Sequence, residues 1–398
     1  MTFRNLRHLR VCLAAADTGS ITRAAEQGLV SQPAVTQAIA GLEIQAGGPI
    51  FERSPQGLFV TERGDLLLRR ARRALALIDG ALSDISPRAA RIVSASQLQA
   101  LIAVAEAENF SLAARRLGLS QPTVHRAVAQ IEREADRKLF QRTSHGVVPT
   151  PACQAITRAA QLALAELTQA EADLADFDGR EVGRIVIGAL PLSRSVLLPR
   201  ALAAFRRLRP TLPVTVIDGR YDDMLASLRR GDIDLMVGAL RDPAPIGDVV
   251  QERLFDDRLV ILSRPDHPLQ EEVPPDLNAL ATWPWAVPAR GTPTRAQIDT
   301  VFAAMPDEGP ASIIETGSLL LMRGLLSQGD FLACLSRVQA AAEIESGAVA
   351  PLRVAIDWPA RPIGLTVRQD WLPTRAQVQL VQALRALPDP AIIPDGSP

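Results

Sequence analysis

The sequence predicts a mixed fold class, in which two small helical domains that each carry a β-hairpin precede a two-lobed α/β domain. One observation behind this prediction is an internal repeat, which relates two stretches of the N-terminal half at a constant offset of 89 residues. The other is a change of pattern at Arg184, after which short apolar runs alternate with helical stretches, as is typical of βαβ units. A chain of 398 residues is long enough for two to four domains.

The repeat extends without a gap well beyond its first match, in which Ser31-Gln32-Pro33 recurs as Ser120-Gln121-Pro122. About 17 of 56 aligned positions are identical. Further matches at the same offset are Ala24-Ala25 with Ala113-Ala114, Val35 with Val124, Phe51 with Phe140, Arg53 with Arg142, and Thr61 with Thr150. Chance does not give an ungapped match of this length, so the two copies are expected to fold alike.

Each copy is predicted to form three helices, with a turn between the second and the third, and then a hairpin. Ser31 is expected to cap the third helix, with Pro33 in its first turn, where a missing N–H costs little. Apolar residues at helical spacing are expected to face inward, namely Val35, Ile39 and Leu42, and in the second copy Val124, Val128 and Ile131. Two short predicted strands, Phe51-Glu52-Arg53 and Leu58-Phe59-Val60, flank the turn Pro55-Gln56-Gly57, which completes a winged helix-turn-helix pattern.

The outer face of each third helix carries side chains that suit DNA. A short helix that presents Gln, Thr and Arg from its N-terminal end can read base edges in the major groove. Arg53 and Arg142, at the bases of the hairpins, are expected to contact phosphates. The candidate DNA-binding residues are Ser31, Gln32, Pro33, Ala34, Thr36, Gln37 and Arg53, and Ser120, Gln121, Pro122, Thr123, His125, Arg126 and Arg142. The alternative for any one of them is a solvated helix face, but the duplication in register favours DNA.

These motifs resemble the DNA-binding domain of LysR-type transcriptional regulators. In the first copy the resemblance rests on Ala24-Ala25, Ser31-Gln32-Pro33-Ala34-Val35, Ile39, Leu42-Glu43, Gly47, Ile50-Phe51, Arg53, Val60-Thr61 and Gly64. The second copy departs from the family pattern at Asp136 and Cys153, which replace two glycines. Because members of the family ordinarily have one such domain, the resemblance implies an atypical member with a duplicated domain. Either copy could then be the one that reads DNA.

An Ala/Leu-rich helix is predicted after each hairpin, at about 64–85 and about 152–177. In the family this helix pairs with its counterpart in another subunit. Two arrangements are open here: the two helices pair within one chain and mimic the usual dimer, or the second helix pairs between chains. The predicted domains are residues 1–63 and 92–151 for the winged helices, 64–91 and 152–178 for the linker helices with their connections, and 179–390 for the C-terminal domain.

The C-terminal domain is expected to contain a largely parallel sheet in each of two lobes. Strands are predicted at 185–188, 214–217, 233–238, 258–264, 283–287, 312–315, 331–335 and 363–368, with a final helix at about 374–386. This half resembles the family's effector domain, which is similar to a periplasmic binding protein, through Gly183–Gly188, Leu197-Leu198-Pro199, Gly231–Leu235 and Asp266–Leu269. The resemblance implies one lobe at 182–264 and 366–390, and a second lobe at 265–365.

The effector is expected between the lobes, near helix N-termini, which favour anionic groups such as those of an organic anion. The candidate effector-binding residues are Ser193, Ser195, Tyr221, Arg290, Thr292, Thr294, Thr316 and Ser318. The alternative for each is a role as a helix cap or turn residue. Arg290 or Arg295 could pair with a carboxylate of the effector.

Other classes of protein are disfavoured. The four histidines are scattered and form no catalytic or metal-binding motif, so an enzyme, a cofactor and a metal are not expected. The three cysteines lie far apart, as in a reducing cytoplasm, and no membrane span is expected because the apolar runs are short. The prediction is therefore a cytoplasmic homo-oligomer, a dimer or tetramer, that binds double-stranded DNA and regulates transcription under the control of a small effector. The alternative is a small-molecule binding protein whose winged helices serve assembly.

The formal net charge of −1 conceals a segregation of charge. Residues 1–91 contain 12 arginines against 8 acidic residues, and residues 92–160 contain 8 basic residues against 5 acidic ones. Five acidic residues follow in 161–178, and residues 179–398 contain 23 basic against 26 acidic residues. Both winged segments are thus modestly basic, which is compatible with DNA binding.

Overall fold

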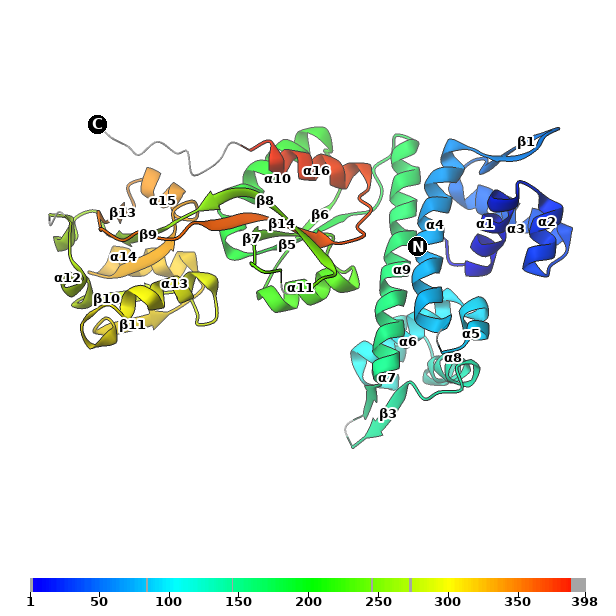
Figure 1. Ribbon diagram of the computed structural model, residues 1–398, viewed down its shortest axis with the longest axis horizontal. Helices are drawn as coiled ribbons and strands as arrows, with labels where there is room; N and C mark the ends of the chain where they lie inside the picture. The colour runs from blue at the N-terminus through cyan, green and yellow to red at the C-terminus, as the bar shows by residue number, and fades with distance from the viewer. Residues whose placement is uncertain (1–2, 84, 145, 245, 272–273, 388–398) are drawn as a thin grey trace.

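The computed structural model describes residues 3–387 except 84, 145, 245 and 272–273. The N-terminal half consists of helices with two small β-hairpins. The C-terminal half consists of two β-sheets with the helices that cover them (Figure 1). The two halves meet along a pair of long helices. The second sheet lies at the end of the molecule that is farthest from this pair (Figure 1).

Two units with the same order of elements make up most of the N-terminal half. The first unit contains α1 (Leu6–Thr18), α2 (Ile21–Gly28), α3 (Gln32–Ala46), β1 (Phe51–Ser54) and β2 (Gly57–Val60). The second contains α6 (Ala95–Ala107), α7 (Phe110–Leu117), α8 (Gln121–Glu134), β3 (Phe140–Thr143) and β4 (Gly146–Pro149). The predicted helices and hairpins are confirmed in both units. The residues expected to face inward, Val35, Ile39, Leu42, Val124, Val128 and Ile131, are all buried.

The same backbone contacts recur in the two units at the offset of the repeat. Gly57 and Gly146 begin the second strand of each hairpin at φ values of +136° and +146°, which favour glycine. A Cβ atom at Gly146 would lie 2.3 Å from the carbonyl oxygen of Glu108, and one at Gly57 would lie 3.0 Å from that of Gly19. The repeated glycine therefore lets each hairpin approach the end of the first helix of its unit.

Repeated polar contacts attach each hairpin to its third helix. The Glu43 carboxylate accepts from the backbone N–H of Ile50 at 3.0 Å, and Glu132 accepts from that of Leu139 at 2.9 Å. The N–H groups of Thr61 and Thr150 close each hairpin against the carbonyls of these same two residues, both at 2.9 Å. The residues that are identical in the two copies thus include the glutamate and the threonine that hold each hairpin, or wing, in place.

The remaining helices of this half are α4 (Glu62–Ser83), α5 (Pro87–Ile92) and α9 (Pro151–Phe177). The short helix α5 occupies the segment that was predicted to be a linker between the copies. Its N-cap Ser86 accepts from the backbone N–H of Ala89, and Ala89 and Ala90 are buried, so this segment packs as part of the core. One continuous apolar core, from Phe3 to Leu174, includes both units and both long helices.

The helices α4 and α9 pack against each other within the chain, in antiparallel directions. Arg63 at the start of α4 pairs with Asp178 just after α9, whereas Arg73, further along α4, pairs with Glu166 nearer the start of α9. Of the two arrangements that the sequence left open, the structure contains the pairing within one chain. The two units lie toward opposite ends of this pair (Figure 1).

The C-terminal half contains two five-stranded sheets. The first has the order β6-β5-β7-β14-β8, formed by β5 (Ile185–Ala189), β6 (Val214–Asp218), β7 (Leu235–Ala239), β8 (Val249–Asp257) and β14 (Arg361–Arg368). The second has the order β11-β10-β12-β9-β13, formed by β9 (Leu259–Ser263), β10 (Pro284–Val287), β11 (Ser312–Glu315), β12 (Leu332–Ser336) and β13 (Ala350–Pro351).

Helices cover both sheets. Those of the first lobe are α10 (Leu197–Leu208), α11 (Tyr221–Arg230) and α16 (Arg375–Arg385), with a short 3₁₀ turn at Pro191–Arg194. Those of the second lobe are α12 (Leu277–Ala281), α13 (Pro293–Phe302), α14 (Leu319–Gln328) and α15 (Ala341–Glu345), with 3₁₀ turns at Pro268–Gln270 and Pro306–Glu308. None of the described helices is long and apolar enough to cross a membrane.

The structure adds three details to the expectations for this half. Each sheet is largely parallel, as expected, with one strand in the opposite direction: β14 runs antiparallel to β7 and β8, and β9 runs antiparallel to β12 and β13. The strand β8 was not predicted, since charged residues interrupt its apolar positions and it lies at a sheet edge. Residues 388–390 of the predicted domain lie outside the described part of the chain.

The chain also crosses between the lobes earlier than expected. The predicted strand 258–264 exists as β9 but belongs to the second sheet, so the first crossing lies between Asp257 and Leu259. The return crossing lies before Arg361, not near 366, because all of β14 belongs to the first sheet. Both strand ends contain charged residues at the crossings, so they could not be located from the pattern of apolar residues in the sequence.

Candidate nucleic-acid interface and effector site

The helices α3 and α8 begin with the same local geometry. Ser31 accepts from the backbone N–H of Ala34, and Ser120 accepts from that of Thr123, both at 3.4 Å. A proline follows two residues after each cap, where the helix needs no N–H donor. Four of the candidate DNA-binding residues, Ser31, Pro33, Ser120 and Pro122, thus start the helices that present the others.

The remaining candidates form two exposed rows. The structure leaves exposed Gln32, Ala34, Thr36 and Gln37 on α3, Gln121, Thr123, His125 and Arg126 on α8, and Arg53 and Arg142 on the hairpins. Exposure at a helix N-terminus is the geometry that reading of base edges requires. Contact with DNA by each of these residues stays a prediction.

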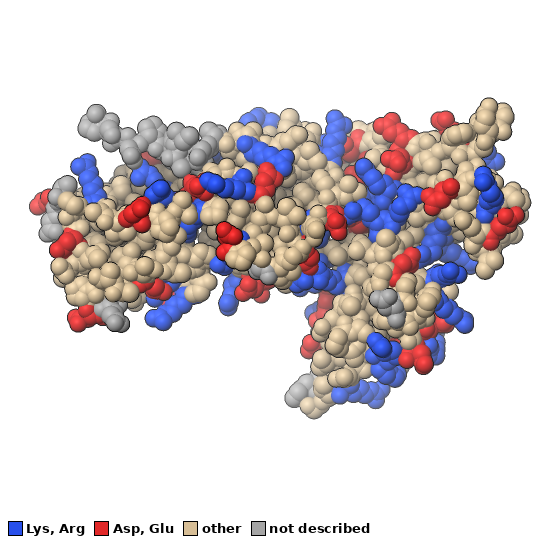
Figure 2. Space-filling model, viewed as in Figure 1, with Lys and Arg blue, Asp and Glu red and all other residues tan. Residues whose placement is uncertain are grey.

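Basic side chains are unevenly distributed over the two halves. Figure 2 shows them along the lower edge of the second unit and across the middle of the helix pair, with acidic side chains between them. The C-terminal half shows both signs interspersed (Figure 2). The charge therefore favours the N-terminal half as the surface for a polyanion.

The eight candidate effector residues follow the ends of strands in the two lobes. Ser193 and Ser195 follow β5, Tyr221 follows β6, and the others follow β10 and β11, namely Arg290, Thr292, Thr294, Thr316 and Ser318. The carboxyl ends of parallel strands are the edge at which open α/β sheets bind ligands. The candidates occupy this edge in both lobes, but no contact brings residues of the two lobes together among these eight.

Four candidates have structural partners. Thr292 and Ser318 cap α13 and α14, and each accepts a backbone N–H of the first turn at 3.2 Å. Thr316 accepts the N–H of Ser318 at 3.1 Å. Ser193 is fully buried and donates to the carbonyl of Leu190 at 2.8 Å. These residues fill the cap and turn roles that the sequence left open as the alternative.

The other candidates are differently placed. The hydroxyl of Tyr221 is buried without a hydrogen-bond partner among the described residues, and the guanidinium of Arg241 lies 4.6 Å from its ring centroid. Burial raises the pKa of Tyr221. Arg290 is exposed, and Ser195 is half-buried at the end of the turn before α10. Among these candidates, Tyr221 thus has a buried hydroxyl with unused hydrogen-bonding capacity.

The guanidinium of Arg295 is already paired within the protein and is not available to bind an effector. Arg295 is 2% exposed, and its guanidinium pairs with Asp299 at 2.6 Å and with Glu315 at 3.0 Å. Of the two arginines that the sequence suggested for a carboxylate, Arg290 is therefore the exposed one.

A buried ion pair that the sequence did not predict lies where the chain crosses between the lobes. Asp257, at the end of β8, pairs with Arg361, at the start of β14, and both are buried. Ser336, at the end of β12 in the second sheet, donates its hydroxyl to Asp257 at 2.7 Å. Arg361 also contacts Thr294, which places this one candidate beside the crossing. Because Asp257 and Arg361 are 104 residues apart, no local pattern could reveal the pair.

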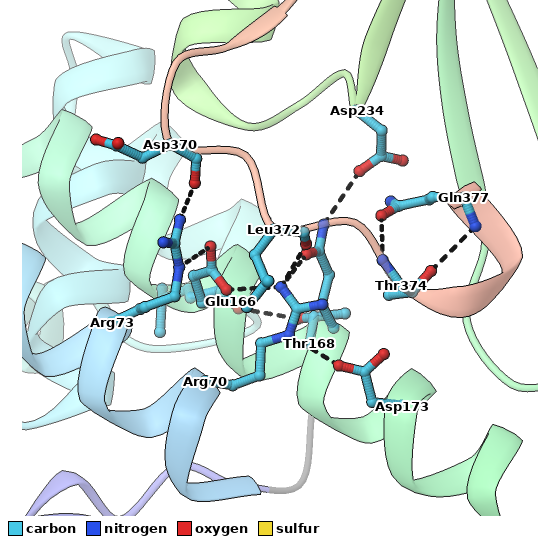
Figure 3. Close-up of polar contacts among 12 residues, drawn as sticks. Arg70, Arg73, Glu166, Thr168, Asp173, Asp234, Asp370, Leu372, Thr374 and Gln377 are labelled. Atoms are coloured by element: carbon cyan, nitrogen blue, oxygen red, sulfur yellow. Dashed lines mark hydrogen bonds and ion pairs between the residues drawn. The ribbon is translucent and has the colours of Figure 1, made fainter. Parts of the chain in front are cut away.

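A second buried network joins the helix pair to the first lobe (Figure 3). Arg70 of α4 is fully buried and contacts Glu166 and Asp173 of α9, both at 2.8 Å. It also donates to the carbonyl of Leu372 at 2.7 Å, while Arg73 donates to that of Asp370. Both carbonyls belong to the segment between β14 and α16, so the helix pair and the first lobe share one polar network.

The network continues into the first sheet. Gln169 of α9 accepts from Arg70 at 2.8 Å and donates to Asp234 at 3.2 Å, and Asp234 in turn accepts from the N–H of Val186 in β5 at 2.8 Å. Burial raises the pKa of Asp234. A cavity of about 280 Å³ lies beside this junction, lined by α9 and the first lobe. None of the eight effector candidates lines it.

Comparison with known proteins identifies the family. The model described as "LysR substrate binding domain" matches residues 178–388, and "Bacterial regulatory helix-turn-helix protein, lysR family" matches residues 6–65 and also 95–154. The chain belongs to the LysR family of transcriptional regulators. As in that family, a helix-turn-helix region for DNA precedes a domain for an effector, so the protein is an effector-controlled, DNA-binding regulator of transcription.

Relatives within the LysR family differ in how much of the chain they match. The HTH-type transcriptional regulator GalR of Pseudomonas putida is 36% identical over 384 residues, which are 96% of either chain. This alignment extends through both segments that match the helix-turn-helix model. PcaQ of Agrobacterium fabrum is 27% identical over 288 residues, which are 72% of this chain but 93% of PcaQ.

A solved structure supports the LysR-type fold. Full-length OxyR from Pseudomonas aeruginosa has a TM-score of 0.54 and 22% identity, and the match covers 74% of this chain and 99% of the OxyR chain. The likeness concerns the fold alone, since the identity is low.

Proposed function

We propose that both helix-turn-helix units bind DNA and that the α4–α9 pair holds them as the two halves of one DNA-binding module. The observation that carries the proposal is the antiparallel packing of α4 on α9 within the chain, with one unit toward each end. In this view the chain is a LysR-family regulator with a duplicated winged helix, and one polypeptide supplies what two subunits supply elsewhere in the family.

The recurrence of sequence and contacts supports a duplication. The family model matches at 6–65 and 95–154, which are 89 residues apart, and the wing contacts of Glu43 and Glu132 recur at the same offset. The 36% identity to GalR along 96% of both chains indicates that a chain of this organisation occurs in a second regulator.

The proposal is tested by the mass of the N-terminal half in solution. Residues 1–178 contain the whole apolar core from Phe3 to Leu174, and we expect this fragment to be a folded monomer. The full chain is expected to be a homo-oligomer that associates through its C-terminal half. A fragment that forms an obligate dimer would contradict pairing of the helices within the chain.

Binding to operator DNA is tested by mobility shift of duplexes from upstream regions at increasing salt. Specific binding should weaken steeply with salt as counterions are released. The absence of a shift, or a shift that is the same for every duplex and disappears at moderate salt, would instead favour the alternative, in which the winged helices serve assembly. Because operator DNA is cytoplasmic in bacteria, the proposal places the protein in the cytoplasm.

We further propose a small organic anion between the lobes as the effector, in a fold similar to a periplasmic binding protein. Tyr221 with Arg241, and Thr294 beside the interlobe pair Asp257–Arg361, are the residues that support this position. All four tryptophans, Trp283, Trp285, Trp358 and Trp371, lie in this half of the chain. Intrinsic fluorescence with a panel of carboxylates therefore tests the proposal, and a signal from uncharged ligands alone would reject the anionic class.

A further inference from the structure

We propose that the two units read different half-sites, so that a single chain recognises an operator that lacks two-fold symmetry and has a direction. The inference rests on the proposed function of both units as DNA readers. It goes further by assigning a different base preference to each of the two helices, α3 and α8. Their residues can be compared one by one, because the caps and wing contacts agree at the offset of 89.

The first exposed positions of the two helices are identical. Each begins with a serine cap, then Gln32 or Gln121, then a proline in the first turn, and all of these are exposed. A glutamine amide suits the N6 and N7 edge of adenine. The two half-sites are therefore expected to share one base pair.

The next three exposed positions of the two helices differ. Ala34 corresponds to Thr123, Thr36 to His125, and Gln37 to Arg126, and every one of these side chains is exposed. Arginine suits the O6 and N7 edge of guanine, whereas glutamine suits adenine. The half-site read by α8 is thus expected to carry a guanine where the half-site read by α3 carries an adenine. The methyl group of Ala34 favours thymine at a neighbouring position.

The charge around the two helices is unequal as well. The helix α3 contains no basic residue, and its exposed surface includes Ile44, at 82% exposure, and Leu29 just before it, at 88%. Around α8, five exposed basic residues occupy positions that are not basic in the first unit: Arg115, Arg116, Arg133, Arg137 and Lys138, in place of Glu26, Gln27, Ile44, Gly48 and Pro49. In the opposite direction, the first unit has the exposed Arg4, Arg7 and Arg23 where the second has Val93, Ser96 and Leu112, and Lys138 pairs with Glu132.

Because the two helices differ in their surrounding charge, the two units are expected to contribute differently to DNA binding. Basic residues attract phosphates in any sequence, and this attraction falls with salt. The helix α8 and its surroundings are therefore expected to supply more salt-dependent affinity than α3, whose own exposed positions offer amide and methyl groups to bases. Two such units on one rigid helix pair define an asymmetric site.

The test selects binding sites for the full-length protein from random duplexes. We expect two different half-sites at a fixed spacing in the enriched sequences. Gln37→Arg should convert adenine to guanine in one half-site only, and Arg126→Gln should convert guanine to adenine in the other half-site only. Each variant should bind the original site roughly 5- to 150-fold more weakly, the range of one bidentate contact. Arg253→Gln, at an exposed arginine of the first lobe, is the matched control and should change no base preference.

The possible outcomes separate this inference from the function on which it rests. Enrichment of an inverted repeat with two identical half-sites would overturn the inference and leave DNA binding intact. So would a swap that alters both half-sites or neither of them. Failure to enrich any sequence over non-specific binding, at low and at high salt, would overturn the inference together with the proposed function.

Discussion

At the scale of single residues, buried charges have the largest predicted effects on stability. Arg70 has no exposed surface and lies between Glu166 and Asp173, and one of its guanidinium nitrogens has no partner among the described residues. Burial raises the pKa of Asp173 in spite of the neighbouring arginine. Burying such charges costs desolvation free energy, which their mutual attraction offsets. Removal of one partner leaves the other charge buried and unpaired, and this strongly destabilises the fold.

Arg70→Ala is expected to destabilise the protein by about 3–5 kcal/mol, because the buried Asp173 loses its paired charge and Glu166 keeps only its pair with Arg73. Urea unfolding followed by circular dichroism measures this effect. Arg72→Ala is the control on the same helix, since its pair with Asp17 is more than half exposed and such pairs contribute at most about 1 kcal/mol. Equal effects of the two substitutions would contradict the role of Arg70.

The contact between Arg63 and Asp178 predicts a dependence on pH. The two arginines that bond to Asp178, Arg63 and Arg180, lower the pKa of its carboxyl from 3.8 to about 2. A carboxyl with a lowered folded-state pKa stabilises the fold above its unfolded value. This contribution is therefore present above about pH 4 and is lost as the pH falls toward 2. Asp178→Asn should lower the unfolding midpoint at pH 6 but much less at pH 3, and a difference that does not shrink would refute the assignment.

At the scale of elements, the sequence predicted much of the N-terminal half and less of the C-terminal half. The capped helices and hairpins have local signals, such as Ser31 with Pro33, so they could be placed from sequence. The strand β8 and the two crossings could not, because Asp257 and Arg361 obscure the strand ends and pair with each other across 104 residues of sequence. The exposure of the candidate rows on α3 and α8 could be predicted from periodicity, whereas the Arg70 network joins segments 96–302 residues apart.

Gly146→Ala is expected to destabilise the second wing by about 1–3 kcal/mol, because its φ of +146° and the 2.3 Å approach to the Glu108 carbonyl exclude a Cβ atom. Thermal unfolding and mobility shift measure the effects on stability and on binding. Gly80→Ala in α4 is the control, and its effect on the free energy of unfolding should have the opposite sign. A Cβ atom there meets no other atom within 4 Å, so this substitution should stabilise the helix by about 0.5–1 kcal/mol. Destabilisation by both would show that the wing geometry is not the cause.

At the scale of the whole molecule, the polar networks suggest which parts move together. The Arg70 network attaches the helix pair to the first lobe, and Figure 1 places the second lobe at the far end. Asp257 and Arg361 hold the crossings between the lobes. Closure of the lobes around an effector would then move the second lobe relative to a body made of the first lobe and the helix pair. An effector shifts this equilibrium only by the difference in its affinity for the two states.

Asp257→Asn is expected to destabilise the C-terminal half by about 3–5 kcal/mol, because it leaves the buried Arg361 without a counter-charge. Unfolding followed by tryptophan fluorescence reports on this half of the chain. Asp256→Asn is the adjacent control, since the exposed Arg253 is its partner and a loss of at most about 1 kcal/mol is expected. A similar midpoint for both variants would argue against the pair as the link between the lobes.

The closure of the α4–α9 pair within one polypeptide has a consequence for regulation at low protein abundance. A DNA-binding module assembled from two subunits falls apart when the protein is diluted below its dissociation constant. In this chain α3 and α8 are joined covalently, so dilution cannot separate them. Each chain also has one effector domain for these two helices. If both helices read DNA as proposed, occupancy of that single domain would set the state of both half-sites of one chain at once.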